Sequence, residues 1–221
     1  MRWHLKNHRQ LGLTFVELLI ILAVVCLLCA LLYPPARGCK GKAPRIACVN
    51  NLKQVALSEL VWANDRSSEE LPAQLSTNSG GLRELLVEGG LARYYQSLSN
   101  ELTSPRILAC PSDSRKPTDD FAALTTNHLS YFLNLDAILG TNFSAVFHGD
   151  RQIEFTPPRR GPSITLSNGT DIRWAKGIHS KDDQGGNAAS VDGSVQSVAS
   201  RADVEEVFRV ARQGGHRFVF P

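Results

Sequence analysis

The chain has 221 residues, of which 43% are apolar and 20% are charged, a balance typical of a protein with a packed core. The formal charge of +3 does not indicate a nucleic-acid-binding surface, because Arg2, Lys6 and Arg9 contribute it all: without them, 21 basic residues remain against 21 acidic ones. No nucleic-acid partner is therefore expected, and the length leaves room for one soluble domain beside a membrane segment.

The N-terminal part divides into a basic stretch, residues 1–12 (MRWHLKNHRQLG), and an apolar stretch, residues 13–33 (LTFVELLIILAVVCLLCALLY). As a helix the apolar stretch would be about 31 Å long, enough to cross a hydrocarbon core. The basic residues before it favour a cytoplasmic N-terminus and an exported body. The sequence thus predicts a short leader, one transmembrane helix and an exported C-terminal domain.

Three ordinary targeting signals compete with this interpretation. A secretory signal peptide needs a small-x-small cleavage site after the apolar run, and residues 30–35 fit that pattern poorly. A lipoprotein signal ending at Cys39 would contain Arg37, which disfavours it. An uncleaved signal anchor fits everything except Glu17, since an ionised side chain in a membrane helix costs about 2.5–3.5 kcal/mol on insertion scales.

Glu17 has a physical explanation if the chain is cut before Leu13. The cut would create an amino terminus at the membrane edge, and the Glu17 carboxylate of one subunit could pair with that amine on its neighbour. In a low dielectric such a pair would set the register between subunits, because an unpaired charge there is penalised. The alternative is that Glu17 extends to the membrane interface from its place near the helix end.

The residues Gly12-Leu13-Thr14-Phe15-Val16-Glu17-Leu18-Leu19 resemble the cleavage and methylation motif of type IV prepilins and type II secretion pseudopilins. The family usually has Phe directly after the cut, where this chain has Leu13. The resemblance implies that a prepilin peptidase cuts after Gly12 and methylates Leu13, and that Glu17 guides assembly with other pilin-like subunits. It also implies a single-pass inner-membrane protein with a cytoplasmic N-terminus and a periplasmic C-terminal domain.

The same resemblance implies an α+β, pilin-like fold, in which a long N-terminal transmembrane and stem helix packs on a small antiparallel sheet. Pro34 and Pro35 should kink the helix. Apolar residues then recur at helical steps, which predicts a helix over 45–64: Val49, Leu52, Ala56, Leu60 and Ala63. We interpret residues 34–65 as the outer stem and residues 66–221 as the globular domain. An independent surface helix would show the same stripe.

The five cysteines fall into two groups. Cys26 and Cys29 have CxxC spacing but lie in the apolar run, which lacks the polar support of a metal or redox site. Cys39, Cys48 and Cys110 follow the membrane segment, and in an oxidising compartment two of them could form a disulfide. A bond between Cys48 and Cys110 is expected, because it would tie the stem to the body.

The body shows shorter elements. Helical spacing over 82–98 is interrupted by a Gly-Gly pair, and a closing helix is predicted over 203–212. Strands are predicted over 128–133, 152–156, 163–166 and 171–174, with a last edge strand over 218–220. Two runs joined at Asp192-Gly193 predict a hairpin over 187–198 with a two-residue type I′ turn.

A second resemblance involves a group of prepilin-type proteins that ends in His, about nine residues, and Asp-Gly. Here twelve residues, Asn187 among them, separate His179 from Asp192-Gly193. The stretches Cys48–Gln54 and Cys110–Asp113 also resemble the group. These matches imply the pilin-like fold and no particular activity.

The same C-terminal region raises the question of metal binding or catalysis. Asp182, Asp183, Asn187 and Asp192 offer oxygen ligands of the kind that Ca²⁺ prefers. Asp192 is, however, explained as a turn residue, and His179 is expected to pin the loop by pairing with a carboxylate or a carbonyl. The sequence contains no G-x-S-x-G motif that would position an activated serine. We therefore expect neither enzymatic activity nor a cofactor, with Ca²⁺ as the alternative.

The function expected from these features is that of a pseudopilin-like subunit. A prepilin peptidase would process it, and it would join a periplasmic filament of a type II secretion-like system. The alternatives are a minor type IV pilin for adhesion or DNA uptake, and a membrane-anchored enzyme or binding protein that does not polymerise.

Overall fold

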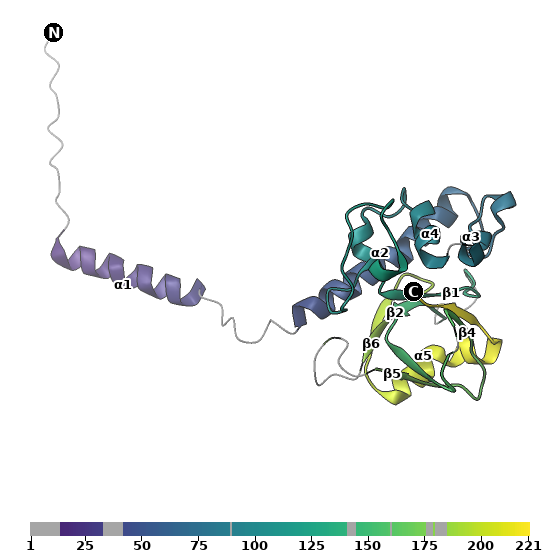
Figure 1. Ribbon diagram of the computed structural model, residues 1–221. Coiled ribbons are helices and arrows are strands. Elements are labelled where there is room, and N and C mark those ends of the chain that lie inside the picture. The colour runs from purple at the N-terminus through teal and green to yellow at the C-terminus, as the bar shows by residue number, and fades with distance from the viewer. Residues whose placement is uncertain are drawn as a thin grey trace, which may run out of the picture. The chain divides into compact units, whose positions relative to one another are not determined.

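A computed structural model describes residues 14–32, 42–88, 90–140, 145–159, 161–175, 179 and 185–221 (Figure 1). The chain divides into two compact units, Met1–Cys39 and Lys40–Pro221. The predicted leader, including Gly12, lies outside the described residues, as does Leu13.

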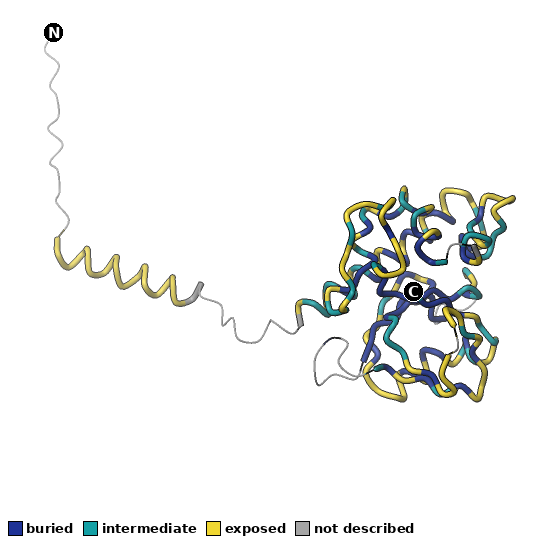
Figure 2. Tube along the Cα trace, viewed as in Figure 1, coloured by how far each residue is buried: buried dark blue, intermediate teal, exposed yellow. Residues whose placement is uncertain are grey.

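The first unit contains the helix α1 (Phe15–Leu32). The residues of α1 whose burial is described are all exposed, as at Phe15 (75%) and Leu28 (51%), and Figure 2 colours this helix as exposed. The predicted membrane segment 13–33 extends past this helix at both ends, to residues outside the described part. Within the described ranges, no helix combines the length and the apolarity that crossing a membrane requires.

The second unit begins with α2 (Lys42–Asp65), which confirms the helix predicted over 45–64. Its buried residues recur at three- and four-residue steps, so one side of the helix packs on strands β2, β6 and β7 of the sheet described below. These residues are Cys48, Leu52, Val55, Ala56, Ser58, Glu59, Trp62 and Ala63. The helices α3 (Arg83–Glu88) and α4 (Gly90–Ser97) confirm the predicted interruption near residue 89, and α5 (Arg201–Gly214) confirms the closing helix.

A six-stranded antiparallel sheet forms the centre of this unit, with the strand order β4-β8-β1-β2-β6-β7. The strands are β1 (Tyr131–Asn134), β2 (Val146–Asp150), β4 (Ser163–Thr165), β6 (Gly186–Ser190), β7 (Val195–Val198) and β8 (Arg217–Val219). A separate antiparallel pair joins β3 (Ile153–Thr156) to β5 (Asp171–Trp174). The predicted α+β class with an antiparallel sheet is therefore present.

The sheet separates two hydrophobic cores. Along β1, Tyr131 and Leu133 point to the core beneath α2 and α4, whereas Phe132 points to the core beneath α5 and the β3–β5 pair. This alternation follows from the two-residue period of a strand. Helices α2, α3 and α4 therefore cover one side of the sheet, and α5 covers the other (Figure 1).

Two strand predictions need correction. The strand expected over 128–133 starts only at Tyr131, because Thr126–His128 forms a 3-10 turn. The strand expected at the edge over 218–220 is β8, which lies inside the sheet between β4 and β1. The apolar run Phe218–Phe220 indicated a strand, but the sequence alone does not show which strands lie beside it.

The hairpin of β6 and β7 is confirmed, but its turn is not type I′. That turn requires positive φ at both central residues, and here Gly193 has φ +78° while Asp192 does not have positive φ. The Gly193 N–H donates to the Ser190 carbonyl, and the Ser190 N–H donates to the Ser194 carbonyl. These bonds enclose a three-residue loop that ends in a left-handed glycine.

Candidate functional site

The three stretches that carried the second resemblance meet at one place beneath α2. Cys48 of α2 and Cys110 form a disulfide across a sequence separation of 62 residues, as predicted. Both cysteines are buried, and a ring nitrogen of His179 lies within 4.8 Å of both sulfurs. We call Cys48, Cys110, Asp150, His179 and Asn187 the junction cluster.

His179 is held by polar groups of β2 and β6. Its Nε2 lies 2.9 Å from Asp150 Oδ2 and 2.9 Å from Asn187 Nδ2. The same Asp150 oxygen accepts a 2.6 Å bond from the backbone N–H of Asn187, and Ser197 donates to Asn187 Oδ1. His179 was expected to pair with a carboxylate or a carbonyl, and its partner is the carboxylate of Asp150. Asn187 connects this pair to the hairpin.

The stretch after Cys110 is anchored beside the junction cluster. Asp113 accepts two bonds from the Arg151 guanidinium, at 2.7 and 2.8 Å, and a third from Gln152. Burial opposes ionisation of Asp113, but the contact with Arg151 outweighs this effect and lowers the pKa of the carboxyl below its usual value. Asn51 of α2 donates to the Ala109 carbonyl, which gives a second link between α2 and this stretch.

Asp192 and Gly193 have a role in the turn. Asp192 Oδ1 accepts a 2.8 Å bond from the Ser194 N–H, which is the turn function predicted for it. A Cβ at position 193 would lie 2.8 Å from a methyl carbon of Leu57, so the glycine lets the loop approach α2. The Ca²⁺ alternative also needed Asp182 and Asp183, which lie outside the described residues.

A second buried polar group, which the sequence did not predict, joins α2 to the sheet. Glu59 and His148 are fully buried, and Glu59 Oε1 lies 3.0 Å from His148 Nε2. Tyr94 donates a 2.6 Å bond to the other Glu59 oxygen. Burial and the Glu59 carboxylate raise the pKa of Tyr94 well above its ordinary value, so its hydroxyl keeps the proton that it donates.

Glu17 has a local partner in α1. Its Oε2 accepts bonds of 2.8 Å from both the backbone N–H and the hydroxyl of Thr14, and the Glu17 N–H lies 3.3 Å from the Thr14 hydroxyl. This reciprocal arrangement is a capping box, which satisfies free N–H groups at a helix start. The spacing Thr-x-x-Glu could have indicated it from the sequence.

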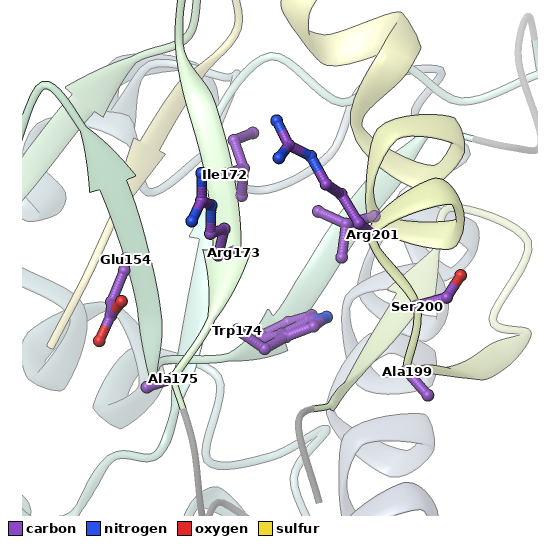
Figure 3. Close-up of a pocket in the computed structure, with 9 residues that line it drawn as sticks. Glu154, Ile172, Arg173, Trp174, Ala175, Ala199, Ser200 and Arg201 are labelled. Atoms are coloured by element: carbon purple, nitrogen blue, oxygen red, sulfur yellow. The ribbon is translucent and has the colours of Figure 1, made fainter.

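A cleft of about 610 Å³ lies away from the junction cluster, between β5 and the start of α5. Figure 3 shows Trp174 extending across the space toward Ala199 and Ser200, with Arg173 and Arg201 beside it. The indole N–H of Trp174 is buried and has no hydrogen-bond acceptor among the described residues.

The charges around this cleft are largely compensated. Asp171 accepts from Arg173 and from Arg201, so the two guanidinium groups do not form a free cationic surface. The Ser200 hydroxyl, the one hydroxyl among the described lining residues, accepts from the Asp203 N–H as the cap of α5. The cleft thus offers an aromatic floor and paired charges.

The chain matches no known protein-family profile, no curated protein and no solved structure.

Proposed function

We propose that the protein is a pilin-like structural subunit, cut after Gly12 by a prepilin peptidase and assembled into a filament at the inner membrane. In this proposal residues 13–33 lie in the membrane before assembly and in the filament core afterwards. The globular unit is periplasmic, and the protein acts by assembly rather than by catalysis.

The observation that carries the proposal is the exposure of α1. Apolar side chains are exposed on every side of this helix, as at Val16 (62%), Ile20 (58%) and Leu27 (63%). Water does not tolerate so continuous an apolar surface, so lipid or other chains must cover it in the working state. A helix that is apolar on all sides can lie in the bilayer before assembly and in the filament core afterwards, because both surroundings are apolar.

Glu17 supports assembly over simple anchoring. It lies in the first turn of α1, four residues after the new N-terminus that cleavage before Leu13 would create. A carboxylate there is costly in an apolar medium unless it is paired. The capping box with Thr14 satisfies hydrogen bonds within one chain, whereas the methylated amine of a neighbouring subunit would neutralise the charge.

The fixed attachment of α2 supports a mechanical role. The disulfide, the Asn51–Ala109 bond and the Glu59–His148 pair each join α2 to the rest of the second unit. A stem that transmits force needs such attachments, since a helix held only by apolar contacts can slide. In this proposal α2 is the outer part of the stem.

We expect Glu17→Gln to reduce incorporation into filaments at least about tenfold, because breaking a buried ion pair costs about 3–5 kcal/mol. Glutamine can still accept from Thr14, so the helix cap survives while the charge is lost. The measurement is the fraction of chain in sheared or cross-linked filaments, with membrane-fraction content measured in the same cells.

The matched control is Thr14→Ala, which removes the capping hydroxyl and keeps the carboxylate. This variant should assemble nearly as the natural chain does. Assembly of Glu17→Gln at the natural level would reject a role for the charge, and equal loss in both variants would assign Glu17 to helix capping alone.

A minor pilin that binds a ligand at the filament tip is the second candidate, favoured by the cleft at Trp174. Asp171 compensates the charges of both arginines at this cleft, which disfavours the nucleic acid of a DNA-uptake pilin as the ligand there.

A further inference from the structure

The junction cluster contains the parts of a metal site. The sulfurs of Cys48 and Cys110 and a ring nitrogen of His179 all lie within 4.8 Å of one another, and the three residues are buried. In a tetrahedral zinc site, Zn–S distances near 2.3 Å and Zn–N distances near 2.0 Å place the ligand atoms about 3.5–3.8 Å apart. The three side chains therefore need to shift by only about 1–2 Å to reach that geometry.

His179 is prepared for such a role by Asp150. Nε2 lies 2.9 Å from Asp150 Oδ2 and 2.9 Å from Asn187 Nδ2, so a hydrogen on Nε2 that is donated to the carboxylate requires the Asn187 amide to turn its oxygen toward the ring. The other nitrogen, Nδ1, is buried and has no hydrogen-bond partner among the described residues. Metal-binding histidines share this arrangement, in which a carboxylate holds one nitrogen and the other binds the ion.

We propose that Cys48, Cys110 and His179 form a redox-gated Zn²⁺ site, closed while the disulfide is intact and open once it is reduced. Two thiolates and one imidazole are a ligand set that Zn²⁺ takes with a fourth position left for water. Asp150 is a positioning residue, which orients the imidazole.

The chemistry balances with a thiol reductant. Two reductant thiols break the Cys48–Cys110 bond, each cysteine sulfur gains one hydrogen, and the reductant leaves as its disulfide. Zn²⁺ then binds the two sulfurs and displaces their two protons to solvent.

The disulfide and the zinc-bound form would both hold α2 to the rest of the second unit. The disulfide joins α2 to the stretch after Pro105–Leu108, and a zinc ion bound to the same sulfurs would restore that connection after reduction. His179 would add a third attachment, which comes from the segment before β6. The site thus keeps α2 fixed where the disulfide has not formed or has been reduced.

The test uses the full chain in mild detergent with Cys26, Cys29 and Cys39 replaced by Ala, which removes the other thiols that could bind zinc. After reduction by a phosphine and its removal, Zn²⁺ is titrated against a chromophoric chelator. We expect one ion per chain in the reduced protein and none in the oxidised protein. Co²⁺ in place of Zn²⁺ should give thiolate charge-transfer absorption and a tetrahedral visible spectrum.

Three further variants in this background identify the ligands. His179→Ala and Asp150→Asn should each weaken zinc binding about 10–100-fold, whereas His128→Ala should not change it. The cobalt spectrum of the unsubstituted cluster needs no variant, so the test stands even if His179→Ala does not fold. Absence of binding after reduction, equal binding in the oxidised chain, or full affinity in a folded His179→Ala variant would overturn the proposal.

Discussion

Replacing Cys48 and Cys110 together by alanine should lower the free energy of unfolding of the second unit by about 4 kcal/mol. The estimate follows from the loop of 62 residues that the disulfide closes, since a longer loop loses more entropy when the unfolded chain is cross-linked. For a unit of this size the melting temperature should fall by about 8–16 °C. Thermal unfolding followed by circular dichroism measures the change.

The reductant provides the control for this experiment. Reduction in the presence of a metal chelator should destabilise the natural chain by a similar amount and leave the double variant unchanged. A double variant with the melting temperature of the oxidised natural chain would show that the disulfide does not restrain α2.

Glu59→Ala should destabilise the second unit by about 3–5 kcal/mol, a large share of the 5–15 kcal/mol that keeps a domain folded. The change leaves His148 without its carboxylate partner and the Tyr94 hydroxyl without its acceptor, both inside the core. Chemical denaturation monitored by tryptophan fluorescence is a direct measurement, because Trp62 lies one turn further along α2.

Two further variants distinguish the effect of losing the polar partners from the effect of losing side-chain volume in the core. Glu59→Gln keeps an oxygen for Tyr94 and should cost less than Glu59→Ala. Replacing the pair by Leu and Phe, as Glu59→Leu with His148→Phe, should restore much of the loss, because an apolar pair needs no partner. Stability loss below about 1 kcal/mol in Glu59→Ala would contradict the burial of this pair.

The sequence predicted the structure best where a single physical requirement, such as burial of one helix face or a positive φ, determines which residue type occurs at a position. The period of the apolar residues predicted α2 and α5, and Asp-Gly placed the β6–β7 turn to within one residue. The Cys48–Cys110 bond followed from the need to attach α2 to the body. The helices and the turn depend on residues close together in the sequence, and the disulfide had only three candidate cysteines beyond the membrane segment.

The central strand β2 was not predicted, because its sequence Val-Phe-His-Gly-Asp does not alternate. A bulge at Phe147 directs both Phe147 and His148 toward the α2 side of the sheet. Gly149 is required because a Cβ there would lie 2.6 Å from the Phe132 ring. These causes are contacts between distant segments, which a periodicity argument does not contain.

In the candidate site, too, the sequence predicted local features and missed contacts between distant segments. The sequence predicted that His179 would pair with a carboxylate or a carbonyl, but the choice of Asp150 depends on the register of β2 with β6. The Glu59–His148 pair was missed because a glutamate on a helix is usually exposed, and only the fold shows that this position turns into the core.

The central claim is processing at Gly12, and the most direct test is the N-terminus of the mature chain. The chain should be co-expressed with a prepilin peptidase, and the N-terminal residue and intact mass of the membrane-fraction protein determined. We predict a chain that begins at Leu13 and carries one added methyl group. A chain that still begins at Met1, or one that begins beyond Tyr33, would contradict assembly as a pilin-like subunit.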